Sequence, residues 1–200
     1  MQLERHAWRL GNRLDSLADN LRRYEAIDLN NLERFTVERT VIQLQIEWEH
    51  FVRAVILDSA TGKYRSKSGP VSSGLPLRVL SREHASFVLI EQYHRRRNEP
   101  DWYLPFEAIQ AAGKLSLTNE GKIATELGIS PWKLDDLRFL RNFIAHRSGR
   151  SAKNVRSVGC VSKAHRIIPS EICFDFQIGG TRRYEGWVAF MKSAGFRLVE

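Results

Sequence analysis

The spacing of apolar residues from Leu3 to Ile56 constrains the fold more than any other feature of the sequence. In the first segment apolar residues recur at alternating steps of four and three, which places them on one face of a helix. They are Leu3, Ala7, Leu10, Leu14, Leu17, Leu21 and Tyr24. The second segment, which Asn30 or Asn31 can cap, has one face of Val37, Val41, Leu44, Trp48, Phe51 and Val55 and a second face of Ile42, Ile46, Val52 and Ile56. We therefore expect two long helices, the second of them central in a bundle.

Local signals predict more helices after a loop. Segment 58–76 is rich in Ser, Gly and Pro and is typical of a mobile loop. Ser81 can cap a third helix that runs to about Arg97, and Ser130 followed by Pro131 can start a helix that stops between His146 and Gly149. Shorter helices are expected at 106–112, 118–127 and 187–194. Segments 155–161 and 171–178 are typical of strands, with a hairpin turn at Gly179 and Gly180.

The predicted fold class is therefore mainly α. We expect a helical bundle of about five helices over residues 1–149. A basic appendage over residues 150–200 is expected to contain a small β-hairpin and a short C-terminal helix.

Composition narrows the class of protein. The chain has 200 residues, 42% hydrophobic and 27% charged, which is typical of a globular protein. It has no apolar run of the roughly 20 residues that a membrane helix needs, and its start lacks the apolar core of a secretion signal, so we expect a cytoplasmic protein. Cys160 and Cys173 are the two cysteines, with neither a close Cys pair nor His at ligand spacing, so we expect no zinc site and no disulfide framework. We also expect no other metal and no cofactor.

Positive charge is concentrated in one window of the sequence. The formal net charge is +8 and the pI is near 9.8, which is compatible with a polyanionic partner. From Leu137 to Ser170 the chain has no Asp or Glu. The window holds Arg138, Arg141, Arg147, Arg150, Lys153, Arg156, Lys163 and Arg166. These eight cations equal the whole net charge of the chain.

A motif of known chemistry stands at the start of that window. The run Leu140 to His146 reads Leu-Arg-Asn-Phe-Ile-Ala-His and resembles the signature of HEPN-family ribonucleases, in which an Arg and a polar residue, often Asn, precede a His. Many members of that family are dimeric helical bundles that act as metal-independent endoribonucleases in toxin–antitoxin and phage-defence systems. The resemblance implies that Arg141 and His146 are catalytic, that Asn142 supports them, and that an antitoxin or defence-system partner exists.

The side chains suit cleavage of RNA by its own 2′-hydroxyl. A His titrates near neutrality, so His146 could take a proton from the hydroxyl or give one to the leaving oxygen. Arg141 could hold two phosphate oxygens and stabilise the charge of the transition state. Further cations are expected to hold the RNA backbone, namely Arg147, Arg150, Lys153 and Arg156.

The spacing of the motif raises a geometric question. Five residues turn an ideal helix by about 140°, so Arg141 and His146 do not share a face of one helix. Either the helix unwinds before His146, or two copies of the motif face each other across a homodimer and each cleft takes side chains from both chains. The family precedent favours the second arrangement.

Other residues offer weaker candidates for the same site. Glu49, in the run Glu47-Trp48-Glu49, could orient His146 or pair with Arg141, although a solvated or paired helix residue is the more common role of such a Glu. Arg78 and His84 form a rival pair at similar spacing, without a polar residue after the Arg. In a purely structural interpretation Arg141 is a surface cation and His146 a helix-capping residue.

Two other functions stay open at this level. The chain could be a catalytically silent HEPN-like module that dimerises or binds a partner. Alternatively, small and apolar residues reproduce the spacing of a helix-turn-helix, with Gly128 at its turn; they are Ala124, Gly128, Ser130, Leu134 and Leu137. Asp135 and Asp136 would then face DNA phosphates and repel them, which disfavours this function.

Overall fold

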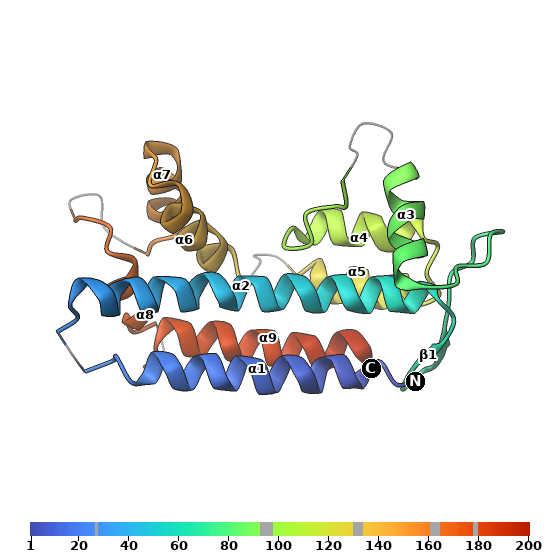
Figure 1. Ribbon diagram of the computed structural model, residues 1–200, viewed down its shortest axis with the longest axis horizontal. Coiled ribbons are helices and arrows are strands. Elements are labelled where there is room, and N and C mark those ends of the chain that lie inside the picture. The colour runs from blue at the N-terminus through green and yellow to red at the C-terminus, as the bar shows by residue number, and fades with distance from the viewer. Residues whose placement is uncertain (27, 93–97, 130–133, 161–164, 178–179) are drawn as a thin grey trace. The chain divides into compact units, whose positions relative to one another are not determined.

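The protein is described by a computed structural model that covers residues 1–26, 28–92, 98–129, 134–160, 165–177 and 180–200 (Figure 1). These residues form nine helices and one two-stranded antiparallel sheet, which confirms the mainly α class. The elements are α1 (Glu4–Arg22), α2 (Asn31–Ala60), β1 (Tyr64–Ser66), β2 (Gly69–Val71), α3 (Arg82–Gln92), α4 (Pro105–Lys114), α5 (Glu120–Leu127), α6 (Asp135–His146), α7 (Gly149–Ser157), α8 (Pro169–Phe174) and α9 (Arg183–Val199).

The chain divides into two compact units. The first unit comprises Met1–Gly11, Trp48–Trp132 and Lys192–Glu200, and the second comprises Asn12–Glu47 and Lys133–Met191. Boundaries between the units fall inside α1, α2 and α9, so each of these helices contributes residues to both units. The predicted division into residues 1–149 and 150–200 stays a prediction.

The two long N-terminal helices form where the apolar spacing predicts them. Leu14 and Leu21 on α1 are fully buried, as are Leu3 directly before α1 and Val41 and Leu44 on α2. The start of α2 is capped as expected, because the Oδ1 of Asn30 accepts hydrogen bonds from the backbone N–H groups of Leu32 and Glu33. The carboxylate of Glu33 in turn accepts from the backbone N–H of Asn30, which completes a capping box.

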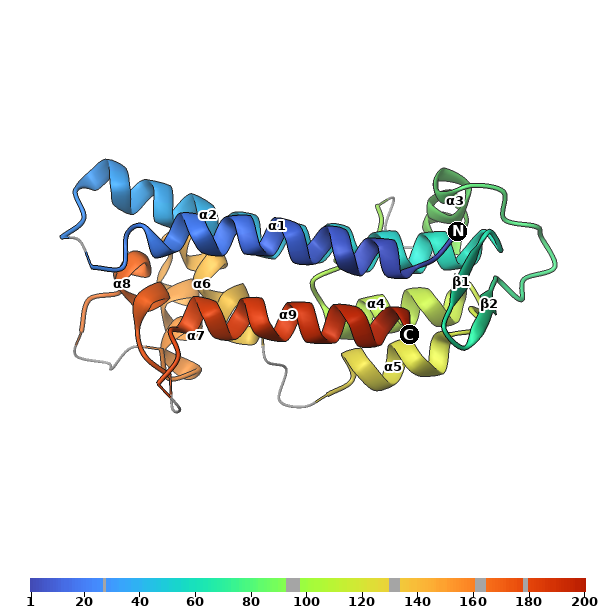
Figure 2. The ribbon, with the colours of Figure 1, turned by 90° about the horizontal axis from the view of Figure 1, so that it is seen from below.

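In the first unit, both ends of the chain pack beside the β-hairpin. The backbone N–H of Leu3 donates to the carbonyl of Arg65 at 3.0 Å, and that of Ser68 donates to the carbonyl of Glu200 at 3.2 Å. Figures 1 and 2 show the two termini beside β1 and β2. Segment 58–76, predicted to be a mobile loop, is therefore in part regular structure, since it includes the end of α2 and the paired strands.

A buried carboxylate, Asp58, and a half-buried one, Glu99, tie elements of the first unit together. Asp58 on α2, only 4% exposed, accepts two hydrogen bonds from Arg82 on α3, at 3.0 and 2.5 Å. The Nε2 of His6 on α1 lies 2.9 Å from the same carboxylate. Glu99 likewise accepts two bonds of 2.5 Å from Arg53, and Ser81 caps α3 as predicted by accepting from the N–H of His84.

In the second unit, α6 is anchored at its first turn. The carboxylate of Asp136 accepts a hydrogen bond from Arg183 at 2.9 Å and one from the indole N–H of Trp187 at 2.8 Å, both on α9. Leu137 and Leu140, fully buried, fix the inner face of the helix. From this anchor α6 leads to α7, against which it packs.

The strands predicted for the C-terminal part are largely wrong. Residues 149–157 form α7 and residues 169–174 form α8, where strands were expected over 155–161 and 171–178. Ser151 and Val155 are buried at a helical spacing of four, and Pro169 occupies the first turn of α8. An isolated bridge between Phe176 and Arg182 is the remnant of the expected hairpin.

Some predicted features fall outside the described residues, namely the turn position Gly179, the arginine run at 95–97, and the caps Ser130 and Pro131. The final helix was predicted at 187–194 and is longer, since α9 spans Arg183–Val199. Among the residues that are described, no helix combines the length and apolar character needed to cross a membrane.

Candidate functional site

The end of α6 carries the three residues that the motif predicts to be catalytic. Arg141, Asn142 and His146 all lie on this helix, and His146 is its last residue. Arg147 then adopts a left-handed conformation with φ of 45°, and its backbone N–H closes the helix on the carbonyl of Phe143 at 2.8 Å. Because α6 continues through His146, the possibility that it unwinds before His146 is wrong.

The guanidinium of Arg141 has a hydrogen-bond partner at one nitrogen and none at another. Its Nη1 donates a hydrogen bond to the Oδ1 of Asn142 at 3.0 Å, so Asn142 orients the guanidinium as a supporting residue would. Its Nε is buried and has no hydrogen-bond partner within the described chain. A buried donor without a partner is costly, so an acceptor brought to this nitrogen, such as a phosphate oxygen, would lower the free energy.

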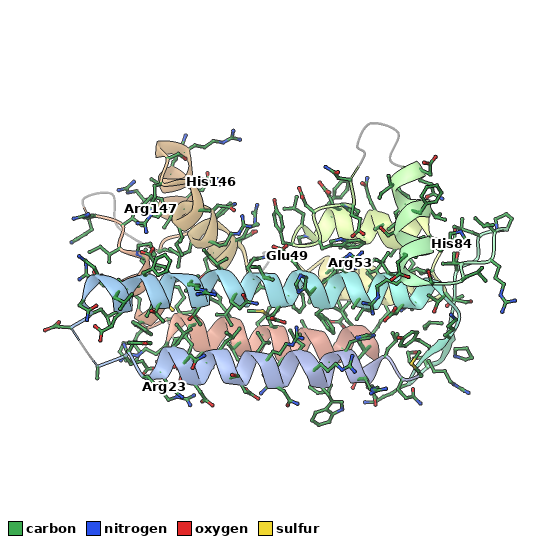
Figure 3. All side chains as sticks on the ribbon, in the orientation of Figure 1. Arg23, Glu49, Arg53, His84, His146 and Arg147 are labelled. Atoms are coloured by element: carbon green, nitrogen blue, oxygen red, sulfur yellow. The ribbon has the colours of Figure 1, made fainter. Side chains whose placement is uncertain are left out.

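His146 lies exposed at the junction of α6 and α7 (Figure 3). Its side chain makes no hydrogen bond or ion pair with any described residue, so it does not cap the carbonyls of α6; the N–H of Arg147 does. The imidazole is therefore accessible for proton transfer to a ligand in solution. Since both side chains stand on one continuous helix, a single chain presents them about 140° apart.

Arg147 is engaged by an acid that sequence reasoning missed. Its guanidinium donates to the carboxylate of Glu38 on α2, and it also lies 5.4 Å from the centroid of the Phe143 ring. The side chain of Glu38 is 14% exposed and that of Arg147 is 51% exposed. Because 109 residues separate the partners along the chain, no local signal in the sequence could have found this pair. The pair ties the α6–α7 junction to α2.

The other predicted RNA-binding cations lie on α7. Ser148 caps this helix, and a reciprocal bond with Ser151 forms a capping box at the turn after His146. Arg150 and Lys153 are exposed. Arg156 is half-buried, with its Nη2 donating to the carbonyl of His165 at 3.4 Å. Two of the expected phosphate contacts are thus open to solvent, whereas Arg147 and Arg156 have protein partners.

Glu49, the predicted supporting acid, belongs to the first unit, whereas Arg141 and His146 belong to the second. The role of Glu49 as a supporting acid stays a prediction. Its neighbour Glu47 lies in the second unit and is engaged by Arg13 at 2.7 Å and by Gln43 at 2.9 Å. Glu38, also in the second unit, contacts Arg147, the residue directly after the motif.

In the rival pair of Arg78 and His84, the histidine has a structural role. The Nδ1 of His84 accepts a hydrogen bond from the backbone N–H of Leu80 at 3.3 Å, at the start of α3, and Arg78 is exposed. The helix-turn-helix interpretation is weakened by the contacts of Asp136 at the start of α6. Asp136, which would have to approach DNA, is bound to Arg183 and Trp187.

The cysteines behave as ordinary core residues. Cys160 and Cys173 are both free and buried, as expected, and burial raises the pKa of the Cys160 thiol to about 11. A thiol with such a pKa is a poor nucleophile near neutral pH. Within the described parts of the chain, no group of three or more His, Cys, Asp or Glu residues is arranged to hold a metal ion.

Comparison of this chain with models of protein families, with curated proteins and with solved structures found no match.

Proposed function

We propose that this protein is a metal-independent endoribonuclease whose catalytic residues are Arg141 and His146. The observation that carries the proposal is the state of the two side chains at the end of α6: a guanidinium oriented by Asn142 with a buried, unpartnered Nε, and an accessible imidazole five residues later. The acid-free segment that follows supplies the exposed cations Arg150 and Lys153, which suit a phosphate backbone.

In the proposed reaction the 2′-hydroxyl of the RNA attacks the adjacent phosphorus. The proton of the hydroxyl passes to a base, the bond from phosphorus to the 5′-oxygen breaks, and that oxygen receives a proton. The products are a 2′,3′-cyclic phosphate and a 5′-hydroxyl. His146 performs one of the proton transfers, and Arg141 stabilises the negative charge on the phosphate oxygens in the transition state.

The proposed enzyme is a homodimer, because the continuity of α6 separates Arg141 and His146 around the helix. Each cleft would take Arg141 from one chain and the partner's His146, with two equivalent clefts related by the twofold axis. The role proposed for the protein is that of a toxin or phage-defence effector, and its regulator would be a separate antitoxin or partner protein.

The first test is cleavage of labelled RNA in EDTA. Wild type is expected to cut RNA and to leave 2′,3′-cyclic phosphate ends, while Arg141→Ala and His146→Ala each lose about a hundredfold or more of the rate. A substrate with deoxyribose at the cleavage position should resist. Arg78→Ala and His50→Ala are matched controls, since both residues are exposed and lie in the first unit. Equal cleavage by all five proteins would overturn the catalytic assignment, and RNA binding without cleavage by wild type would indicate the silent HEPN-like module instead.

The second test addresses the shared cleft. When Arg141→Ala and His146→Ala are mixed and allowed to exchange subunits, the mixed dimer keeps one intact cleft of two, so about a quarter of wild-type activity should return. If each chain carried its own complete site, mixing would restore nothing. A monomer in light scattering that nonetheless cleaves RNA would also remove the shared cleft.

A further inference from the structure

A cavity in the second unit combines an excess of negative charge with unused polar groups. It has a volume of about 360 Å³, within the range of small-molecule sites. Its walls come from the connection between α1 and α2, the first turn of α2, α8 and the residues between α8 and α9. Four carboxylates and two guanidinium groups line it, which leaves two negative charges in excess. In a chain with a net charge of +8, this local excess is opposite in sign to the rest of the molecule.

Two of the four carboxylates already have partners. Glu25 accepts a hydrogen bond from the hydroxyl of Tyr184 and lies 3.9 Å from Arg182. Glu171 lies 3.8 Å from Arg34. Both arginines are thereby directed toward carboxylates of the cavity itself, so they do not leave it positively charged.

The other two carboxylates, Asp28 and Asp175, make no side-chain hydrogen bond or ion pair with any described residue. Partial burial raises the pKa of Asp175, and the charges of Arg183 and Arg182 offset this only in part. A carboxylate in that condition gains from a nearby positive group that also donates hydrogen bonds. The unused acceptors of the cavity are therefore anionic.

A fully buried hydroxyl provides an independent sign of a ligand. Ser170 lines the cavity and is 0% exposed, and its Oγ has no hydrogen-bond partner within the described chain. Buried hydroxyls in proteins are nearly always satisfied, by the protein, by water or by a bound molecule. A ligand with several N–H donors would satisfy Ser170 and the two free carboxylates together.

We propose that this cavity binds a linear organic dication, a diamine or an amino-guanidine, with its nitrogens on Asp28, Asp175 and Ser170. A dication matches the two negative charges in excess, and N–H donors match the three unused acceptors. The site is separate from Arg141 and His146 and does not depend on the proposed ribonuclease activity.

The test is isothermal titration calorimetry of the full chain with putrescine and with agmatine at low ionic strength. Wild type is expected to bind one molecule per chain, and Asp28→Asn and Asp175→Asn should each weaken binding by about tenfold through loss of a charge-assisted hydrogen bond. Ser170→Ala should weaken it about threefold. Circular dichroism checks that each variant is folded.

Matched controls separate this site from general charge effects. Asp19→Asn removes an exposed acid of the same unit that lies outside the cavity, and it should bind like wild type. The uncharged isostere 1,4-butanediol should give no binding heat. The proposal is overturned if wild type binds neither amine, if Asp19→Asn weakens binding as much as Asp175→Asn does, or if Asp175→Asn changes the oligomeric state while amines bind nowhere.

Discussion

Asp58 in the first unit and Asp175 in the second are the same residue type in opposite electrostatic situations. Burial alone would raise the pKa of Asp58, but its contacts with His6 and Arg82 outweigh burial and lower the pKa to about 2. At Asp175 partial burial wins, and the pKa is raised. Asp58 stabilises the fold in its charged form, whereas the charge on Asp175 opposes folding.

The difference separates groups that hold the fold from groups left for a ligand. Asp58 on α2 contacts His6 on α1 and Arg82 on α3 through its carboxylate. The carboxylate of Glu99 likewise accepts hydrogen bonds from Arg53, Ser86 and Trp102. Buried polar atoms without a hydrogen-bond partner occur in both units, among them the Nε of Arg141 and the Oγ of Ser170 in the second and the Oδ1 of Asn119 in the first. Such atoms reduce stability, and proteins commonly retain that cost at functional sites.

Among the substitutions that test this difference, Asp58→Asn is expected to change the free energy of unfolding most. The amide cannot neutralise Arg82, and its NH2 group faces the same donors, so the free energy of unfolding should fall by about 3 kcal/mol. Urea denaturation measures it. Asp19→Asn is the control, because its partner Arg22 and Asp19 itself are 59% and 63% exposed and an exposed pair contributes little. A loss under about 0.5 kcal/mol for Asp58→Asn would contradict the structural role.

Low pH should reduce the difference in stability between wild type and Asp58→Asn. The pKa of Asp58 is lowered from 3.8 to about 2, so its contribution to stability is full above the unfolded pKa and is lost as pH falls through the folded pKa. The gap between wild type and Asp58→Asn should therefore shrink by about 2 kcal/mol between roughly pH 5 and pH 2. Urea denaturation at several pH values checks this, and a gap independent of pH would show that the carboxylate charge is not what stabilises the fold.

The parts of the fold that the sequence predicted are those with a long local repeat or a capping residue. The stripes on α1 and α2, the caps Asn30 and Ser81, and the end of α6 near His146 all follow from neighbours within a few residues. The errors came from short segments. Segment 155–161 suggested a strand, although the capping box of Ser148 and Ser151 and the burial of Val155 mark a helix.

For the candidate site, sequence predicted which residues lie at the end of α6 but not what surrounds them. The pairing of Arg147 with Glu38, and the gathering of Asp28, Ser170 and Asp175 at one cavity, depend on residues far apart in the chain. No periodicity or motif encodes such contacts, since they arise only when the helices pack. Glu49 was suggested by the run Glu47-Trp48-Glu49, and its role as a supporting acid stays a prediction.

The smallest expected change in the free energy of unfolding is that of Asp175→Asn, and it is an increase rather than a decrease. Asp175→Asn removes a charge that partial burial disfavours, so at neutral pH the free energy of unfolding should rise, by about 0.5 kcal/mol after allowance for solvent screening of an exposed side chain. Because the folded pKa is raised, this gain should vanish once the pH is low enough to protonate the carboxyl group in both states. Paired urea titrations of wild type and Asp175→Asn at neutral and acid pH measure it. A clear loss of stability at neutral pH would mean that Asp175, like Asp58, holds the fold, and it would remove the reason to regard this carboxylate as reserved for a ligand.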